Sequence, residues 1–392
     1  MAALSPMMQQ YFDIKKQHPD KILFFRLGDF YEMFYDDAIL ASKELELTLT
    51  GRDCGQEERA PMCGVPFHSY ENYVARLIAK GYKVAICEQM EDPALAKGLV
   101  KRDIIRVVTP GTVIESSMLQ DDKNNYIASI YITEKKAGVC FADVSTGTAH
   151  ATVLTDEKLG PEIISELCRY SPSEVLFNAA ILDYKEVTAY IKQQLACSVE
   201  LLDEAAFAPD ACMEEMRAQF GDAPEKTAGL APESPAFTAL AVLLGYLKET
   251  QKKGVERLKT VHNYAEAQYM QLSPVTRANL ELTETMRGRE KKGTLLWVLD
   301  KTQTAMGKRL MRAWIEQPLV NVAAINARLD GVEELVGDSV ARADIAAALS
   351  KIFDIERLMT RTVYGSASPR EIYALAATCE QPVSYTHLTL PT

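Results

Sequence analysis

A short apolar run, followed by a glycine and a cluster of aromatic residues, most strongly constrains the fold of this chain. Residues 21–27 have the length and apolar character of a strand, and Gly28 follows them at once. Apolar side chains at helical spacing then predict a helix over about residues 31–44. Four aromatic residues lie within six positions at the junction: Phe30, Tyr31, Phe34 and Tyr35. We therefore expect Phe30 and Glu32 near a strand-to-helix turn, where side chains can leave the core and contact a partner.

Length and composition limit the class of protein. The 392 residues predict two or three domains, and a hydrophobic content of 47% is ample for globular packing. Residues 1–20 lack a signal-peptide core and the longest apolar run is too short for a bilayer, so we expect a cytoplasmic protein without a membrane partner. The eight cysteines have no paired spacing, which indicates free thiols rather than disulfides or a structural zinc site.

The net charge of −11 is unevenly distributed along the chain. Residues 116–255 contain 12 Lys and Arg against 21 Asp and Glu, so we do not expect this segment to contact nucleic acid. The first 115 residues contain 14 against 17, with a local basic run at Lys97, Lys101, Arg102 and Arg106. Basic runs are more often solvated surfaces than phosphate sites, and so few cations predict weak nucleic-acid binding with modest salt dependence.

The first segment, residues 1–115, alternates strands and helices and predicts a mixed α/β domain. Ser69 is expected to cap the N-terminus of its best-punctuated helix. The strands are expected at 21–27, 45–50, 82–88 and 104–109, and the helices at 5–17, 31–44 and 69–80.

The second segment follows a polar linker expected at residues 116–125 and extends over residues 126–255. Three β-rich stretches separated by short polar turns predict an antiparallel meander, and alternating helix and strand follow. The meander strands are expected at 126–133, 137–144 and 148–154, and the later elements at 161–170, 174–177, 184–195, 199–202 and 235–254.

The third segment, residues 256–381, predicts helices only. Its expected buried positions are Leu295, Leu299 and residues 310–314, and Ser368 with Glu371 predicts a capping box at a helix start. Residues 382–392 are polar and β-prone.

Five motifs of the first segment occur in a fixed order, beginning with Gly-Asp-Phe-Tyr-Glu at residues 28–32. The others lie at residues 59–68, 71–73, 84–89 and 108–112. Their sequences and order resemble the mismatch-recognition domain of the MutS DNA mismatch repair family, and the resemblance extends to about Glu380. It implies an α/β multidomain protein: a mixed α/β mismatch-recognition domain at 1–115, a ribonuclease H-like α/β connector at 126–255, the start of an all-α core/lever domain at 256–381, truncated there, and a non-native tail at 382–392.

The resemblance also implies roles for two residues of the first motif. Phe30 would be a wedge, because an aromatic ring enters a base step at lower cost where a mispair has weakened stacking. Glu32 would accept a hydrogen bond from a displaced base, and its charge would disfavour intact duplex, where that bond cannot form. Contacts to the DNA backbone are expected from Arg52, Arg59, His68, Ser69 and Arg76, near glycine-rich turns or on the following helix.

Partners and cofactors follow from the same resemblance. It implies double-stranded DNA with mismatches or small loops, a homodimer in full-length form, and a MutL-type partner at the connector. The phosphate-binding pattern G-x-x-x-x-G-K-[ST] is absent from the sequence, so we expect no enzyme activity and no cofactor in this chain. The resemblance implies an ATPase domain that uses ATP and Mg²⁺, and it places this domain and the clamp beyond residue 392. Two alternatives remain: a ribonuclease H-like metal-dependent nuclease using Asp143, and a connector module that binds only protein.

Overall fold

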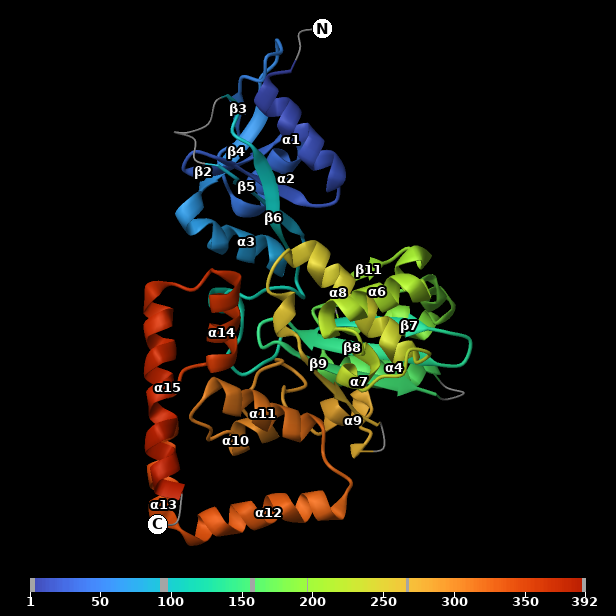
Figure 1. Cartoon of the computed structure of the whole chain (residues 1–392), viewed down its shortest axis with the longest axis vertical. Coiled ribbons are helices and arrows are strands. Elements are labelled where there is room, and N and C mark those ends of the chain that lie inside the picture. The colour runs from blue at the N-terminus through green and yellow to red at the C-terminus, as the bar shows by residue number, and fades with distance from the viewer. Residues whose placement is uncertain (1–3, 92–97, 156–158, 196, 266–267, 390–392) are drawn as a thin grey trace. The chain divides into compact units, whose positions relative to one another are not determined.

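The computed structural model of the chain describes residues 4–91, 98–155, 159–195, 197–265 and 268–389 (Figure 1). It divides into two compact units. The first comprises Met1–Met118 and Tyr246–Val255, and the second comprises Leu119–Gly245 and Glu256–Thr392. The expected class, mixed α/β sheets followed by an all-helical stretch, is confirmed. No helix in the described part of the chain combines the length and apolar character that a membrane span requires.

The first unit contains a six-stranded sheet in the order β3-β4-β2-β1-β5-β6. Strand β1 pairs antiparallel with β2 and parallel with β5. The strands are β1 (Ile22–Leu27), β2 (Phe30–Phe34), β3 (Thr50–Arg52), β4 (Ala60–Pro66), β5 (Val84–Gln89) and β6 (Arg102–Val108). The helices are α1 (Pro6–Gln17), α2 (Tyr35–Leu45) and α3 (Tyr70–Ala79). Helix α1 packs on one sheet face, where Tyr11 meets the rings of Phe25 and Phe34 edge to face.

Asp37 joins three elements of this unit through one buried carboxylate. It accepts hydrogen bonds from the backbone amide of Leu23 on β1 (3.0 Å) and from the hydroxyl of Tyr11 on α1 (3.4 Å). Lys15 on α1 forms an ion pair with it at 2.9 Å. Because Asp37 lies in the first turn of α2, its negative charge also suits the positive end of that helix dipole.

The predicted helix over residues 31–44 is wrong at its start, because Phe30–Phe34 is strand β2. A two-residue turn at Gly28 and Asp29 joins it to β1, and Gly28 adopts φ +58°, a conformation that glycine favours. The predicted strand at 45–50 is also wrong: Leu45 ends α2, and only Thr50–Arg52 pairs with β4.

The end of the first unit is closed by a helix that returns from later in the sequence. Helix α8 (Pro235–Gln251) contributes its last residues, from Tyr246 onward, to this unit. The side-chain amide of Gln251 donates to the carbonyl of Val107 (3.0 Å), and Arg106 Nε donates to the side-chain carbonyl of Gln251 (2.8 Å). The first unit is therefore discontinuous in sequence.

The second unit contains a six-stranded sheet in the order β11-β10-β7-β8-β9-β12. The expected antiparallel meander is confirmed as β7 (Ile127–Ile132), β8 (Ala137–Asp143) and β9 (Thr148–Leu154). Strands β10 (Glu174–Phe177) and β11 (Ser198–Leu201) add in parallel at one edge, and the unpredicted strand β12 (Thr260–Asn263) pairs in parallel with β9.

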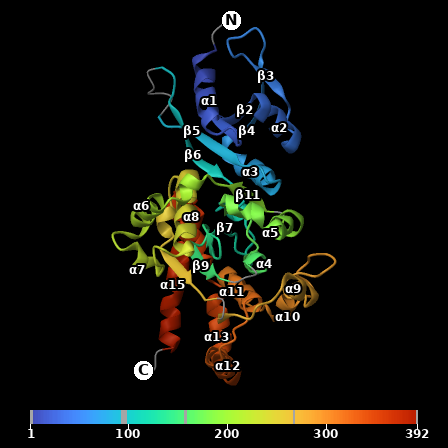
Figure 2. The ribbon, with the colours of Figure 1, turned by 90° about the vertical axis from the view of Figure 1, so that its right-hand side faces the viewer.

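Helices cover both faces of this second sheet (Figure 2). Helices α4 (Leu159–Tyr170) and α5 (Lys185–Tyr190), with a π-helical turn at Ile191–Leu195, lie on one face, where Phe141 stacks on Tyr170 with ring centroids 4.0 Å apart. Helices α6 (Pro209–Phe220), α7 (Pro224–Ala228) and α8 lie on the other. Helix α8 approaches β8 so closely that a Cβ atom built on Gly138 would lie 1.9 Å from the carbonyl oxygen of Pro235.

The chain from residue 274 onward is helical, as expected. The prediction that residues 256–381 form helices only is wrong at its start, because Thr260–Asn263 is strand β12 of the second sheet. Its elements are α9 (Pro274–Asn279), α10 (Leu295–Leu299), α11 (Ala305–Glu316), α12 (Val322–Gly337), α13 (Ser339–Leu349), α14 (Ile355–Tyr364) and α15 (Pro369–Thr389). The capping box is confirmed, because the amide of Ser368 donates to Glu371 (2.8 Å) and the amide of Glu371 donates back to the Ser368 hydroxyl (3.4 Å).

Two expectations about this helical segment are wrong. Leu295, Leu299 and Leu310 are 43 to 54% exposed, whereas Leu296 and Ile315 form the buried positions. Helix α15 also continues to Thr389 through residues whose composition is β-prone.

Residues 119–125 are not a loose linker, because basic side chains from the helical segment hold their backbone. Arg357 donates to the carbonyls of Gln120 and Lys123, both at 2.8 Å. Arg309 donates to the carbonyl of Asp121 (3.3 Å) and forms an ion pair with Asp354 (2.7 Å). Charged donors to main-chain acceptors are among the stronger hydrogen bonds in proteins, so this stretch is part of the second unit.

Candidate nucleic-acid interface

Phe30 lies at the exposed end of the β1–β2 hairpin. It pairs with Leu27 on β1 and with Pro66 on β4, and its side chain is 47% exposed. The aromatic residues that follow it behave differently: Tyr31 and Phe34 are buried, and Tyr35 is intermediate. A half-exposed phenyl ring on a backbone paired from both sides is a rigid apolar projection.

Phe67 forms a second exposed aromatic side chain beside this strand end. It directly follows Pro66, the β4 partner of Phe30, and its amide donates to the carbonyl of Asp29 in the hairpin turn (2.9 Å). The guanidinium of Arg26 lies 3.6 Å from the centroid of the Phe67 ring and forms an ion pair with Glu88 at 3.3 Å. Sequence reasoning did not single out Phe67, although it lies within the motif at residues 59–68.

Glu32 lies two residues along β2 from Phe30, on the same face of the sheet. Its carboxylate forms an ion pair with Arg52 at the end of β3. The Glu32 side chain is 13% exposed, and that of Arg52 is 37% exposed. Arg52, expected to contact DNA phosphate, is therefore engaged with the other predicted site residue.

The remaining predicted backbone contacts fall into two groups. Arg59 and His68 have exposed side chains. Arg76 instead donates to the carbonyls of Leu45 (3.1 Å) and Glu44 (3.4 Å), at the C-terminal end of α2. The expected capping by Ser69 is wrong, because its hydroxyl donates to the carbonyl of Pro66 (3.4 Å) and makes no capping bond to α3.

Two cations of the predicted basic run are structural. Arg102 is 8% exposed, stacks on Phe25 and donates to the carbonyl of Arg26 (2.7 Å). Arg106 forms an ion pair with buried Glu115; burial alone would raise the pKa of Glu115, but the charge of Arg106 and hydrogen bonds hold it below its ordinary value. Of the other two, Lys101 is exposed and Lys97 lies outside the described residues.

Asp143, the residue of the nuclease alternative, is completely buried and saturated with donors. Its Oδ1 accepts from the amide and hydroxyl of Ser145 (2.8 and 2.7 Å). Its Oδ2 accepts from the side chain of Asn124 (2.8 Å) and the amide of Asn125 (3.1 Å). No group of three or more His, Cys, Asp or Glu side chains within the described residues is placed to hold a metal ion. The geometry gives Asp143 a turn-stabilising role.

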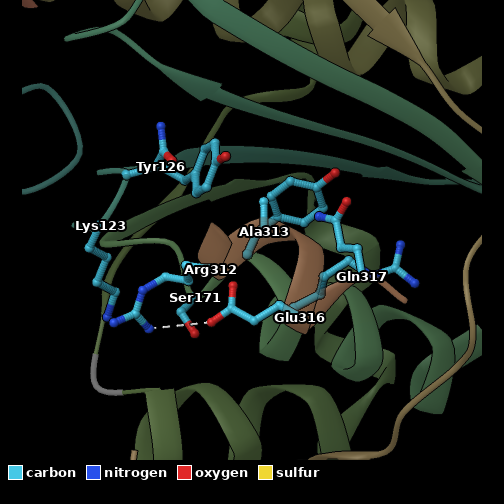
Figure 3. Close-up of a pocket in the computed structure, with 10 residues that line it drawn as sticks. Lys123, Tyr126, Ser171, Arg312, Ala313, Glu316 and Gln317 are labelled. Atoms are coloured by element: carbon cyan, nitrogen blue, oxygen red, sulfur yellow. Dashed lines mark hydrogen bonds and ion pairs between the residues drawn. The ribbon is translucent and has the colours of Figure 1, made fainter. Parts of the chain in front are cut away.

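A small pocket of the second unit lies where α11 meets the end of α4 (Figure 3). Figure 3 shows Arg312 and Glu316 pointing toward each other, with an ion pair of 3.4 Å between them. Burial raises the pKa of Glu316, although the charges of Arg312 and Arg277 oppose the shift. Arg312 also donates to the carbonyl of Asp122 (3.1 Å), so the pocket belongs to the packing around residues 119–125.

Comparison with known families and proteins gives a consistent result over nearly the whole chain. Residues 5–117 match the family described as MutS domain I, residues 125–261 match MutS domain II, and residues 275–390 match MutS domain III.

Three curated relatives are each named DNA mismatch repair protein MutS. The protein of Ruminiclostridium cellulolyticum is 50% identical over 383 residues, which cover 97% of this chain and 44% of the relative. The proteins of Acetivibrio thermocellus and Alkaliphilus oremlandii are 48 and 45% identical, over 96% of this chain and 43% of each relative. The chain therefore spans less than half the length of these relatives.

Proposed function

This chain belongs to the MutS family of DNA mismatch repair proteins, and on that premise we propose that its first unit recognises mispaired or unpaired bases in double-stranded DNA. Phe30 is the wedge that enters the weakened base step. The observation that carries this proposal is the 47% exposure of Phe30 at the end of the β1–β2 hairpin, whose other aromatic residues are all buried.

The selectivity of a wedge comes from the DNA rather than from a base code. Separating a sound base step costs on the order of a few kcal/mol, and a mispaired step has already lost part of that stacking. A rigid ring regains about 1 to 3 kcal/mol by stacking on an exposed base. The difference in deformation cost between the two duplexes is therefore expressed as a difference in affinity.

Glu32 adds a requirement for a hydrogen-bond donor at the same step. A carboxylate near DNA phosphates is unfavourable unless it is compensated, and a displaced base can offer an N–H group to it. Replacing Glu32 with Ala should therefore tighten binding to matched duplex and reduce discrimination. Unchanged affinity for both duplexes would exclude this role.

The test of the wedge is Phe30→Ala in the 392-residue chain, measured by fluorescence anisotropy at low ionic strength, where phosphate contacts contribute most. We expect affinity for mismatched duplex to fall by about 5- to 150-fold and affinity for matched duplex to be largely kept. Ile39→Ala is the matched control, since Ile39 is a similarly exposed apolar side chain (51%) on α2. Equal losses on both duplexes with Phe30→Ala would reject the wedge.

The whole family protein has further proposed properties that are not assigned to residues of this chain. They are ATP hydrolysis with Mg²⁺, dimerisation, a cytoplasmic location, and binding of a MutL-type partner at the second unit. The phosphate-binding pattern does not occur in the 392 residues, so no residue here is assigned to ATP. The nuclease alternative is disfavoured by the saturated carboxylate of Asp143, and loss of magnesium-dependent cleavage in Asp143→Asn would reinstate it.

A further inference from the structure

We propose that Arg52 determines specificity by exchanging partners. In the free protein Arg52 is paired with Glu32. It moves to a DNA phosphate only when a displaced base donates a hydrogen bond to Glu32 in its stead. This inference rests on the proposed roles of Phe30 and Glu32. Discrimination between mismatched and matched duplex then comes from one phosphate contact, which matched duplex cannot obtain.

The sheet brings the two charges together across an intervening strand. Glu32 is on β2 and Arg52 is on β3, with β4 between them. The β4 residue directly opposite Glu32 is Gly64, and a Cβ atom at Gly64 would lie 3.4 Å from Cγ of Glu32. The carboxylate side chain of Glu32 therefore lies against Gly64, where the absence of a side chain leaves room for it.

The exposures of the two side chains show which partner faces outward. Glu32 is 13% exposed and Arg52 is 37% exposed, so the guanidinium is the more accessible member of the pair. A base that approaches the carboxylate must compete with Arg52 for it. A phosphate that approaches Arg52 must compete with Glu32.

Charge neutralisation changes how Glu32 acts on matched DNA. While the pair persists, Arg52 partly neutralises Glu32, so the carboxylate repels phosphates less than an unpaired carboxylate would. Intact duplex offers no base donor, so Arg52 stays on Glu32 and contributes no phosphate contact. At a mispair, the base donor satisfies Glu32 and the phosphate gains Arg52.

The test is the salt dependence of DNA binding, which counts phosphate contacts and does not respond to a merely structural role. Each contact with duplex contributes about 0.9 to the slope of log affinity against log salt concentration, or about 3.5-fold in affinity for a fourfold change in salt. For the wild-type chain we expect a slope about 0.9 steeper on mismatched than on matched duplex. Arg52→Gln should remove that excess on mismatched duplex and leave the slope on matched duplex unchanged.

Glu32→Gln provides the complementary variant because it retains Arg52 and removes its competitor. In this variant the slope of log affinity against log salt concentration on matched duplex should become steeper by about 0.9, and so equal the slope on mismatched duplex. Arg59→Gln is the matched control: Arg59 is an exposed cation at the neighbouring end of β4, and its removal should change both slopes equally. Circular dichroism checks that each variant is folded.

Two results would overturn the exchange. One is an equal change of both slopes in Arg52→Gln, and the other is an unchanged slope on matched duplex in Glu32→Gln. The second result does not depend on Arg52→Gln being folded. Failure of the proposed function is distinguishable, because the wild-type chain would then show no preference for mismatched duplex or Phe30→Ala would leave the preference intact.

Discussion

Gly138 offers the sharpest test of the packing in the second unit. Replacing a strand glycine by alanine normally stabilises a protein by about 0.4 to 1 kcal/mol, because the unfolded chain loses freedom. At Gly138 the added Cβ would lie 1.9 Å from the Pro235 carbonyl oxygen and 2.3 Å from the amide nitrogen of Ala236. Both are backbone atoms at the start of α8, so the side chain cannot avoid them by changing rotamer.

The required movement sets the expected magnitude. Cβ atoms essentially never lie within 3.0 Å of such neighbours, so α8 or β8 must shift by about 1 Å. Helix α8 is largely buried, with Phe237, Leu240, Leu243, Leu244 and Leu247 at most 2% exposed. Overpacking of a core costs about 1 to 3 kcal/mol, and the shift also loosens contacts along the helix. We therefore expect Gly138→Ala to lower the free energy of unfolding by at least about 2 kcal/mol.

Urea denaturation followed by circular dichroism, with amide hydrogen exchange on β8, measures this loss. Gly331→Ala is the matched control, because Gly331 lies within α12 with nothing near its Cβ position. The same substitution there should stabilise the helix by up to about 1 kcal/mol. If Gly138→Ala were as stable as the wild-type chain, the close approach of α8 to β8 would be refuted.

Three other substitutions test single interactions by the same unfolding measurements. Burial and the nearby His262 lower the pKa of His150 to about 4. As the pH is lowered from 6.5 to 4, the unfolded state therefore binds a proton that the folded state does not, and the free energy of unfolding decreases by about 3 kcal/mol. His150→Phe should lose this pH dependence, and an unchanged pH profile would contradict the reasoning. Arg309→Met should cost about 3 kcal/mol, because Asp354 loses its closest cation and keeps only Arg357, 3.9 Å away; a neutral result would show the pair to be dispensable. Asp37→Ala should cost about 2 kcal/mol, because the buried amide of Leu23 loses its acceptor, while Tyr11 and Lys15 keep the carbonyls of Phe34 and Lys21; a loss below about 1 kcal/mol would rule out its role as a junction.

Long elements with strong periodicity were predictable from the sequence. The meander β7, β8 and β9 alternates with polar turns, and its three strands lie within two residues of the expected bounds. Strand β12 has only four residues and pairs with β9, more than 100 positions earlier, so nothing local identifies it. Strand β2 was missed because apolar side chains at helical spacing continue from it into α2, and pairing with both β1 and β4 decided the conformation.

The residues of the candidate site were predictable from the sequence, but the contacts between them were not. Phe30 was expected to project, and it does so from a strand rather than from a helix start. Arg52 and Glu32 are 20 positions apart, and only the order β3-β4-β2 brings them together. Arg102 shows the opposite error: its charge suggested a surface, but stacking on Phe25 places the guanidinium in the core. Charge alone does not distinguish a phosphate contact from a buried hydrogen-bond donor.

The discontinuity of the first unit has a consequence for the order in which it matures during synthesis. Met118 leaves the ribosome about 140 residues before Val255, a delay of about 7 to 28 s at ordinary elongation rates. During that interval Arg106 and Val107 lack the side chain of Gln251. The nascent first unit therefore stays open at one end until much of the second unit has been translated.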